Sequence, residues 1–583
     1  MKAEAPNSKN TRVDALSTWQ QASLILISVL LVALGQPARC WWCGLIAAAA
    51  GFALFWRFLL SINKPSERFW MATGWAFIVE ITHSSWFIAH PFIYIYGVWI
   101  ILSFGCALQF GLVSLLITHR RVIHLPSLAV IAAIWTLMEW ARLFLMSGYS
   151  LNPFGLALTG HIYPMQMASL WGVYGMTFWI IFVNLLLLRA WILWKETSYR
   201  YVAFSLWMIA ASVPYFYGYV HYSYHANAFA QEQATNPKNM SVVLVQPAFL
   251  PEEAIQYRDP QGAITHVINE WRQILTIMSK HLGEKNDLIA LPEFVVPYGT
   301  YTPIYPADTI IALFKEILGE ESLKGLPPMD DPWAAEIQTK TGMRWYVDNA
   351  FIAQALSTIF QAEVVVGLED VEFAPDINAG KKLNFYSAAI CFHPNMEIEE
   401  RYEKRVLVPM AEYIPFTFCK EIAATYGISG SFTPGKEARI FQSAGIPFGC
   451  CICYEETFGH LMRESRLLGA QVLVNVTSDV WFPNSRLPQQ HFDHARLRTV
   501  ENGIPLVRAC NTGITCAVDS LGRVVDSLGK EGENEWISDS IRIQVPLYHY
   551  QTIYSSYGDK PLIGFCFIAL FSWLGIGYIR KRY

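Results

Sequence analysis

The feature that most constrains this chain is a series of long apolar runs between Gln20 and Val220. This stretch holds fourteen charged residues among 201 positions. Several of the runs reach the roughly 20 residues that a helix needs to cross a hydrocarbon core of about 30 Å. With 53% hydrophobic and 15% charged residues overall, the chain is too apolar for a single water-soluble domain, a disordered protein or a small disulfide scaffold.

The apolar pattern predicts eight membrane-spanning helices, seven before a long polar segment and one after it. A cleavable signal peptide is the competing interpretation of the first run, but the sixteen residues before it are long and mixed in charge. We therefore expect that run to be a retained helix. The predicted spans are 17–34, 41–62, 69–90, 93–118, 125–146, 165–191, 201–220 and 562–579.

The distribution of Lys and Arg predicts the orientation. Basic residues gather in alternate connections, and both chain ends belong to the basic side. By the positive-inside rule these connections face the cytoplasm, which makes residues 1–16 and 580–583 cytoplasmic tails. The segment 235–554 then lies on the opposite side of the membrane from both chain ends.

Segment 235–554 has the composition of an ordinary α/β domain. Short buried-strand patterns occur at 241–245, 287–291, 364–368, 387–392, 446–454 and 472–476, with helical periodicity at 262–282 and 489–501. About 320 residues suffice for one substantial core. Residues 300–350 are polar and irregular in pattern, and we interpret them as a possible insertion or lid.

Charge and cysteine content argue against two other classes of protein. A net charge of −4 without a long basic block makes nucleic acid an unlikely partner. The eleven cysteines form no dense framework, and most are expected to be buried free thiols. A metal site at Cys450, Cys451, Cys453 and His460 is disfavoured because adjacent strand positions face opposite ways.

Three residues at the ends of predicted elements form a chemically coherent set. Cys453 follows a strand where the pattern turns helical, Glu293 ends another apolar run, and Lys404 lies in a charged stretch. Each alone has a structural interpretation, as a buried thiol, a turn cap or a solvated charge. Together they supply a general base, a nucleophile and a cation for an oxyanion, at elements that could converge on one edge of a sheet.

The blocks around these three residues resemble those of the nitrilase superfamily. The blocks are Leu291-Pro292-Glu293, Lys404 with 407–409 and 412–415, and Ile452-Cys453-Tyr454-Glu455, in the same order as in that superfamily. The flanking runs 478–482, 490–492, 495–498, 501–503, 505–508 and 511–515 are similar to bacterial apolipoprotein N-acyltransferases. Members of that family also have seven helices before a nitrilase domain and one helix after it.

The resemblance implies an αββα nitrilase-type domain attached to a helical transmembrane bundle. It implies Glu293 as general base, Lys404 as oxyanion stabiliser and Cys453 as nucleophile. The backbone N–H of Tyr454 would assist, and Glu412 and Glu455 would support the site.

The implied reaction is ping-pong and needs no cofactor or metal. Cys453 accepts an acyl chain from a membrane phospholipid as a thioester, and the α-amine of a diacylglyceryl-cysteine lipoprotein then takes the chain. A long-chain donor is poorly available from water, at about 0.8 kcal/mol per exposed CH₂, so the site should open at the bilayer surface. We expect a monomer.

Two alternatives remain at this stage. A membrane-tethered amide hydrolase would use the same three residues with water as the acceptor. A transporter or scaffold would carry an inactive nitrilase domain.

Overall fold

The computed structural model describes most of the chain. The described residues are 16–35, 40–195, 199–251, 255, 259–340, 342–373, 383–396, 399–416, 419–425, 431–530 and 535–582. The predicted tail 1–16 therefore lies almost wholly outside them.

The N-terminal region is helical, and each predicted span corresponds to a helical segment. Among the described residues, four helical segments are long and apolar enough to cross a membrane, namely Trp41–Leu59, Tyr94–Ser114, Leu125–Phe144 and Ala168–Ile192. The helices are α1 (Thr18–Leu34), α2 (Trp41–Ile46), α3 (Phe52–Leu59), α4 (Pro65–His83), α5 (Tyr94–Ser114), α6 (His119–Ile123), α7 (Leu125–Ala141), α8 (Ile162–Met165), α9 (Ala168–Ile192) and α10 (Arg200–Thr235). A π-helical turn, Ala47–Gly51, joins α2 to α3.

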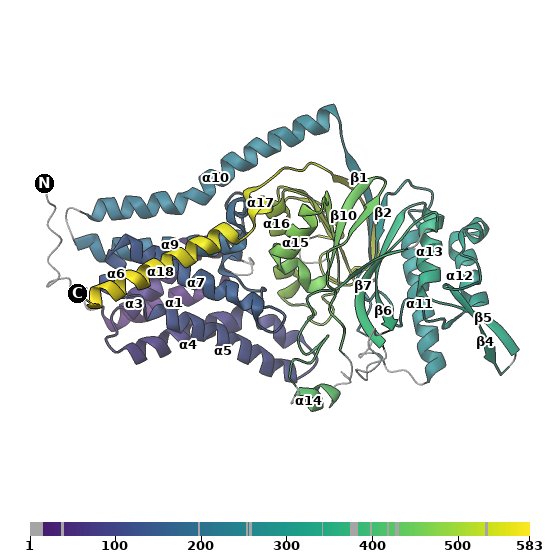
Figure 1. Cartoon of the computed structure of the whole chain (residues 1–583), viewed down its shortest axis with the longest axis horizontal. Coiled ribbons are helices and arrows are strands. Elements are labelled where there is room, and N and C mark those ends of the chain that lie inside the picture. Colours follow the sequence, from purple (N-terminus) through teal and green to yellow (C-terminus); the bar gives the residue numbers. More distant parts are fainter. Residues whose placement is uncertain are drawn as a thin grey trace.

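The last helix, α18 (Lys560–Arg582), returns to this helical region and packs against α7 and α9 (Figure 1). Leu562 and Cys566 of α18 belong to the same buried apolar cluster as residues of α3, α4, α5, α7 and α9. The C-terminal helix is thus part of the bundle, although almost 370 residues separate it from α9 along the chain.

The second region is an α/β domain built on two six-stranded sheets. The first has the order β15-β1-β2-β6-β7-β8 and the second the order β14-β13-β12-β11-β10-β9. The strands are β1 (Asn239–Gln246), β2 (Leu288–Ala290), β6 (Glu363–Phe373), β7 (Leu383–Phe392), β8 (Glu400–Glu403), β9 (Ile440–Ser443), β10 (Ile446–Ile452), β11 (Val472–Thr477), β12 (Leu506–Cys510), β13 (Cys516–Val518), β14 (Val524–Ser527) and β15 (Asp539–Pro546).

The alternation of side chains along β1 shows how the layers form. Val243 and Val245 belong to the apolar cluster shared with α11 (Pro260–Ser279) and α13 (Asn349–Phe360), whereas Val242 and Leu244 belong to the core between the sheets. Successive strand residues point to opposite faces, so a strand buried on both faces is apolar throughout. Helices α15 (Gly459–Leu467) and α16 (Leu487–Asn502) cover the outer face of the second sheet. The result is the αββα arrangement that the resemblance implies (Figure 1).

Residues 300–350 are more regular than their sequence pattern predicted. They contain α12 (Ala307–Leu318) and an antiparallel sheet of three strands, β3 (Tyr305–Pro306), β5 (Gly342–Val347) and β4 (Ala334–Thr339). Half of the residues of strand β4 are polar, and pairing with β5 rather than an apolar face stabilises it. This segment thus forms regular elements despite its irregular sequence pattern.

Helix α10 links the two regions. Its 36 residues lead almost directly into β1. His221 Nδ1 lies 3.1 Å from Gln166 Oε1 in the helical region, and His225 Nδ1 lies 2.8 Å from the hydroxyl of Tyr548 in the α/β domain. The ring of His225 also stacks on Tyr550, with centroids 3.8 Å apart. One helix is thus bonded to both regions.

Candidate active site

Glu293 lies just beyond β2, where the chain passes over the neighbouring strand β6. The Leu291 N–H continues the pairing by donating to the Val365 carbonyl at 2.8 Å. A Cβ on Gly367 of β6 would lie 2.5 Å from Glu293 Cα and 2.6 Å from the Pro292 carbonyl oxygen. Glycine at this position therefore allows the close approach that places Glu293.

Lys404 follows edge strand β8, and its ammonium group lies between two carboxylates. The backbone N–H of Lys404 donates to the Ser387 carbonyl at 2.8 Å. Its Nζ lies 2.8 Å from Glu293 Oε1 and 2.5 Å from Glu412 Oε1. The Lys404 side chain is fully buried, so both ion pairs are shielded from water.

Cys453 follows β10 of the second sheet, at the start of a 3₁₀ turn, Cys453–Thr457. Its φ of 52° is in the left-handed region, which residues with a side chain seldom adopt. The side chains of Glu293 and Thr477 lie close enough to the Cys453 thiol for each to shift its pKa. The strand-to-turn change predicted at Cys453 is thus present.

The three predicted residues meet across the sandwich. Glu293 and Lys404 come from the first sheet and Cys453 from the second. The expectation that they would share one edge of a single sheet was therefore wrong. The two sheets pack face to face, so residues that follow β2, β8 and β10 can meet although these strands are not hydrogen-bonded to one another.

The electrostatics of the site favour a neutral thiol beside a charged ammonium group. Burial raises the pKa of the Cys453 thiol well above its usual value, and the neighbouring Glu293 charge adds to this effect. Burial also raises the pKa of Glu293, with Glu412 adding to the rise and Lys404 opposing it. Burial opposes the charge of Lys404, but Glu293 and Glu412 outweigh it and raise the pKa of the ammonium.

Glu455 joins the Lys404 segment to the Cys453 turn. Its Oε1 accepts from the N–H groups of Arg405 at 2.6 Å and Val406 at 3.1 Å. Its Oε2 accepts from the Ile452 N–H at 2.9 Å and the Tyr402 hydroxyl at 2.8 Å. One buried carboxylate therefore receives four donors from two segments of the chain.

Glu412 and Tyr454 hold further parts of the site. Glu412 Oε2 accepts from the Val408 N–H at 2.8 Å, which fixes the carboxylate that faces Lys404. The Tyr454 hydroxyl donates to the Gly148 carbonyl at 3.0 Å and accepts from the Ser150 N–H at 3.2 Å. Burial raises the pKa of Tyr454 to about 12. The residue after Cys453 thus contacts the loop that follows α7.

Two residues near Cys453 were not singled out from the sequence. Asn475 Nδ2 donates to the Cys453 carbonyl at 3.3 Å, and Thr477 lies close enough to the thiol to lower its pKa. Both lie on β11, whose other residues are mostly apolar. The presence of two polar residues in an otherwise apolar strand was the sequence signal that could have identified them as site residues.

The described residues also contain one set of side chains suited to a metal ion. The ligand atoms of Glu363, Cys391 and His393 all lie within 4.8 Å of one another, and His393 Nδ1 is 2.6 Å from Glu363 Oε2. Glu363 begins β6, whereas Glu293 follows the parallel strand β2, so this set lies at the opposite end of the sheet from Glu293.

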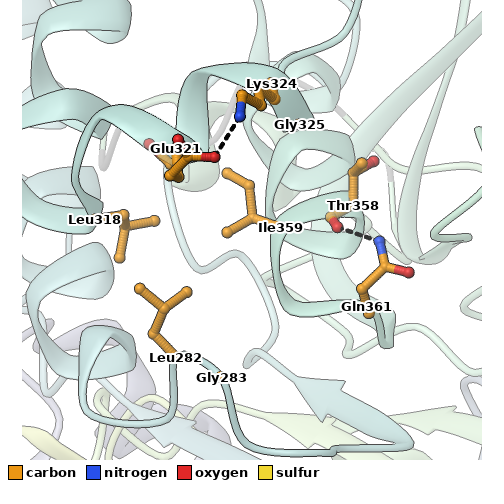
Figure 2. A pocket seen from close by; sticks show the side chains of 10 residues that line it. Leu282, Gly283, Leu318, Glu321, Lys324, Gly325, Thr358, Ile359 and Gln361 are labelled. Carbon is orange, nitrogen blue, oxygen red and sulfur yellow. Dashed lines mark hydrogen bonds and ion pairs between the residues drawn. The ribbon is translucent and has the colours of Figure 1, made fainter.

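A surface hollow of about 430 Å³ lies among the outer helices, away from the three predicted residues. Figure 2 shows apolar side chains around it, including Leu282, Leu318 and Ile359, with an ion pair between Lys324 and Glu321 at its rim. The hydroxyls of Ser322 and Thr358 at this hollow donate to backbone carbonyls rather than to a base, so we do not assign the reaction to it.

The α/β domain with its Glu, Lys and Cys cluster defines a nitrilase-type fold, and comparison with known families agrees. Residues 253–544 match the carbon-nitrogen hydrolase model, and residues 28–186 match the N-terminal domain of apolipoprotein N-acyltransferase. A carbon-nitrogen hydrolase from Helicobacter pylori, 16% identical, aligns with 53% of this chain and 89% of its own, with a TM-score of 0.32.

Full-length relatives narrow the assignment. An apolipoprotein N-acyltransferase from Chlamydia pneumoniae is 32% identical, with 96% of this chain and 97% of the relative aligned. One from Chlamydia muridarum is 33% identical over 95% of this chain and 96% of the relative. The chain therefore belongs to the apolipoprotein N-acyltransferase family, a group of membrane acyltransferases with a nitrilase-type domain. This membership argues against the hydrolase and inactive-domain alternatives.

Proposed function

We propose that Cys453 carries the acyl group between a membrane phospholipid and a diacylglyceryl-cysteine lipoprotein. The observation that carries the proposal is the bonding of the Cys453 turn to the membrane-helix region through Tyr454 and the loop after α7. This contact supports a site that opens next to the membrane helices. An acyl donor can then reach the site without exposing its chains to water.

In the first half-reaction, Glu293 takes the proton of the Cys453 thiol as sulfur attacks the donor ester carbonyl. Lys404 Nζ and the Tyr454 N–H stabilise the resulting oxyanion. The intermediate collapses when the C–O bond breaks, and the proton on Glu293 passes to the leaving lysophospholipid oxygen. A thioester on Cys453 remains.

In the second half-reaction, the lipoprotein α-amine attacks the thioester carbonyl and Glu293 accepts the amine proton. The C–S bond breaks, the amide forms, and the proton returns to Cys453. The raised pKa of Glu293 suits both transfers because a stronger base takes a thiol or ammonium proton more readily. Glu412 and Glu455 position Lys404 and the Cys453 turn.

The membrane arrangement is also part of the proposal. We assign eight spanning helices, with α1, α4, α10 and α18 joining the four long apolar segments. Residues 17–220 form the seven-helix region, 235–554 the periplasmic catalytic domain with 300–350 as an insertion, and 562–579 the last span. Both ends, 1–16 and 580–583, are cytoplasmic, and the enzyme acts as a monomer in the bacterial inner membrane. The basic connections support this orientation.

The test is the intact mass of the purified protein after exposure to phospholipid vesicles without acceptor. Wild type should gain one acyl mass, and Cys453→Ala should gain none. Cys450→Ala is the matched control because Cys450 is buried on β10, just before the Cys453 turn, with its side chain in the inter-sheet core. It should be acylated like wild type. Persistent acylation of Cys453→Ala would rule out the proposed nucleophile.

A further inference from the structure

A cluster of four buried charged side chains lies behind the nucleophile turn. His491 comes from α16, Glu456 from the 3₁₀ turn, Arg508 from β12 and Asp479 from the loop after β11. Arg508 Nη2 lies 2.9 Å from Glu456 Oε1, and Arg508 Nε donates to Glu456 Oε2 at 3.2 Å. The exposed fraction of each side chain is 4% or less.

Both ring nitrogens of His491 face acceptors. Nδ1 lies 3.0 Å from Asp479 Oδ1. Nε2 lies 3.2 Å from Glu456 Oε1 and 3.2 Å from the Cys453 carbonyl oxygen. A neutral imidazole has one N–H, so one of its nitrogens would turn a lone pair toward an acceptor. The geometry therefore selects the doubly protonated ring.

Charge balance supports the same protonation state. With His491 positive, two cations and two carboxylates share the cluster, whereas a neutral ring would leave a net negative charge in a buried site. Burial and Arg508 oppose protonation, but Glu456 and Asp479 outweigh them and raise the pKa of His491. The neighbouring ring of His494 on the same helix has its pKa held well below the usual value by burial.

The cluster is bonded directly to the nucleophile. The Cys453 carbonyl accepts from Asn475 Nδ2 and from His491 Nε2. The left-handed conformation of Cys453 is unfavourable for a residue with a side chain, and such a conformation persists where the surroundings hold it in place. The two donors hold the peptide group whose direction sets where the thiol points.

We infer that His491 is a positioning residue, whose imidazolium group fixes the Cys453 carbonyl and thereby aims the thiol at Glu293. The inference rests on the proposed role of Cys453 as the nucleophile. The cation has a second effect, because it offsets the charge of Asp479, which raises the pKa of Cys453. His491 touches no reacting atom and acts through the Cys453 backbone.

The test compares full-length wild type with His491→Gln in detergent micelles containing phospholipid. His281→Gln is the matched control, since His281 is also buried and bonded to a carboxylate, but on the far side of the first sheet beside α11. Two quantities are measured: the single-turnover rate of Cys453 acylation against phospholipid concentration, and the rate of Cys453 alkylation by iodoacetamide against pH.

We expect His491→Gln to slow acylation about 10²-fold, the cost of a misplaced reacting group, with the half-saturating phospholipid concentration unchanged. Its alkylation profile should move to higher pH, because loss of the cation leaves excess negative charge beside the thiol. His281→Gln should match wild type in both measurements. If His491 only stabilised the fold, the folded molecules of His491→Gln would show the same dependence of Cys453 alkylation on pH as wild type.

A double variant keeps the test decisive if His491→Gln folds poorly. In His491→Gln with Glu456→Gln, one cation and one carboxylate are removed together, so the cluster stays balanced. Its alkylation profile should resemble that of wild type while acylation remains slow. Wild-type acylation rates in either variant would overturn the inference. Absence of an adduct on Cys453 in wild type would instead refute the proposed function.

Discussion

Gly367→Ala tests whether one missing side chain allows the general base to reach its position. The new Cβ would lie 2.5 Å from Glu293 Cα and 2.6 Å from the Pro292 carbonyl oxygen, and both are backbone atoms that cannot rotate away. Carbon atoms in contact are about 3.5–4.0 Å apart, so the Glu293 backbone must move by about 1 Å. Gly367 does not have a positive φ, so the effect is steric rather than conformational.

The displacement should affect activity more than folding. Overpacking of a core typically costs about 1–3 kcal/mol, which a domain of this size tolerates. A shift of about 1 Å in a catalytic group costs about 10²-fold in rate, because Glu293 loses its alignment with both Cys453 and Lys404. We therefore expect a folded variant that forms the acyl-enzyme about 10²-fold more slowly.

The assay is the time course of acyl-adduct formation by intact mass, together with the thermal unfolding midpoint. Gly262→Ala is the control, since its Cβ would have one ordinary contact, 3.4 Å from Asp259 Oδ1. That variant should react like wild type. If Gly367→Ala also reacts at the wild-type rate, the steric account of how Glu293 is placed is wrong.

Three further predictions follow from the contacts of the site. The rate of acylation should fall with decreasing pH as Glu293 is protonated, at a midpoint above the ordinary Glu pKa of 4.5. Glu412→Gln should move that midpoint to lower pH, because the Glu412 charge raises the pKa of Glu293. A midpoint that does not move in the pH–rate profile of this variant would contradict the prediction. Lys404→Met should abolish acylation of Cys453. It should also lower the unfolding free energy by about 3–5 kcal/mol, measured by denaturant unfolding, because Glu293 and Glu412 lose their buried cation. Tyr454→Phe should cost about 1 kcal/mol by the same measurement, because it removes both hydroxyl bonds to the 148–150 loop, and an unchanged stability would show that these bonds contribute little.

Much of the fold could be predicted because the pattern of burial is local. The predicted strand at 241–245 lies within β1, and its unbroken apolar run reflects burial on both faces. The predicted helix at 489–501 lies within α16. In contrast, β4 and β5 were missed because their exposed residues leave no apolar alternation, and their pairing is decided by each other.

The site was less accessible to sequence reasoning, because its geometry depends on distant segments. Glu293 and Lys404 are 111 positions apart in the sequence and form an ion pair. The family resemblance pointed to both residues but not to the contact between them. Gly367 was not predicted as a site residue, because it matters only through its close contact with the Pro292–Glu293 backbone, which the sequence does not show. The run containing His491 was noticed only as a family likeness, and its contacts with Asp479 and Glu456 appear only when α16 packs on the second sheet.

The length and bonding of α10 have a consequence for how substrates enter and leave. At 1.5 Å per residue its 36 residues extend about 54 Å, well beyond the 30 Å of a hydrocarbon core. Because the helix is bonded to Gln166 at one level and to Tyr548 at another, it acts as a strut between the two regions. A rigid-body swing of the catalytic domain would break these bonds together with those of Tyr454. We therefore predict that lipid and lipoprotein exchange by local rearrangement near the site rather than by a domain swing.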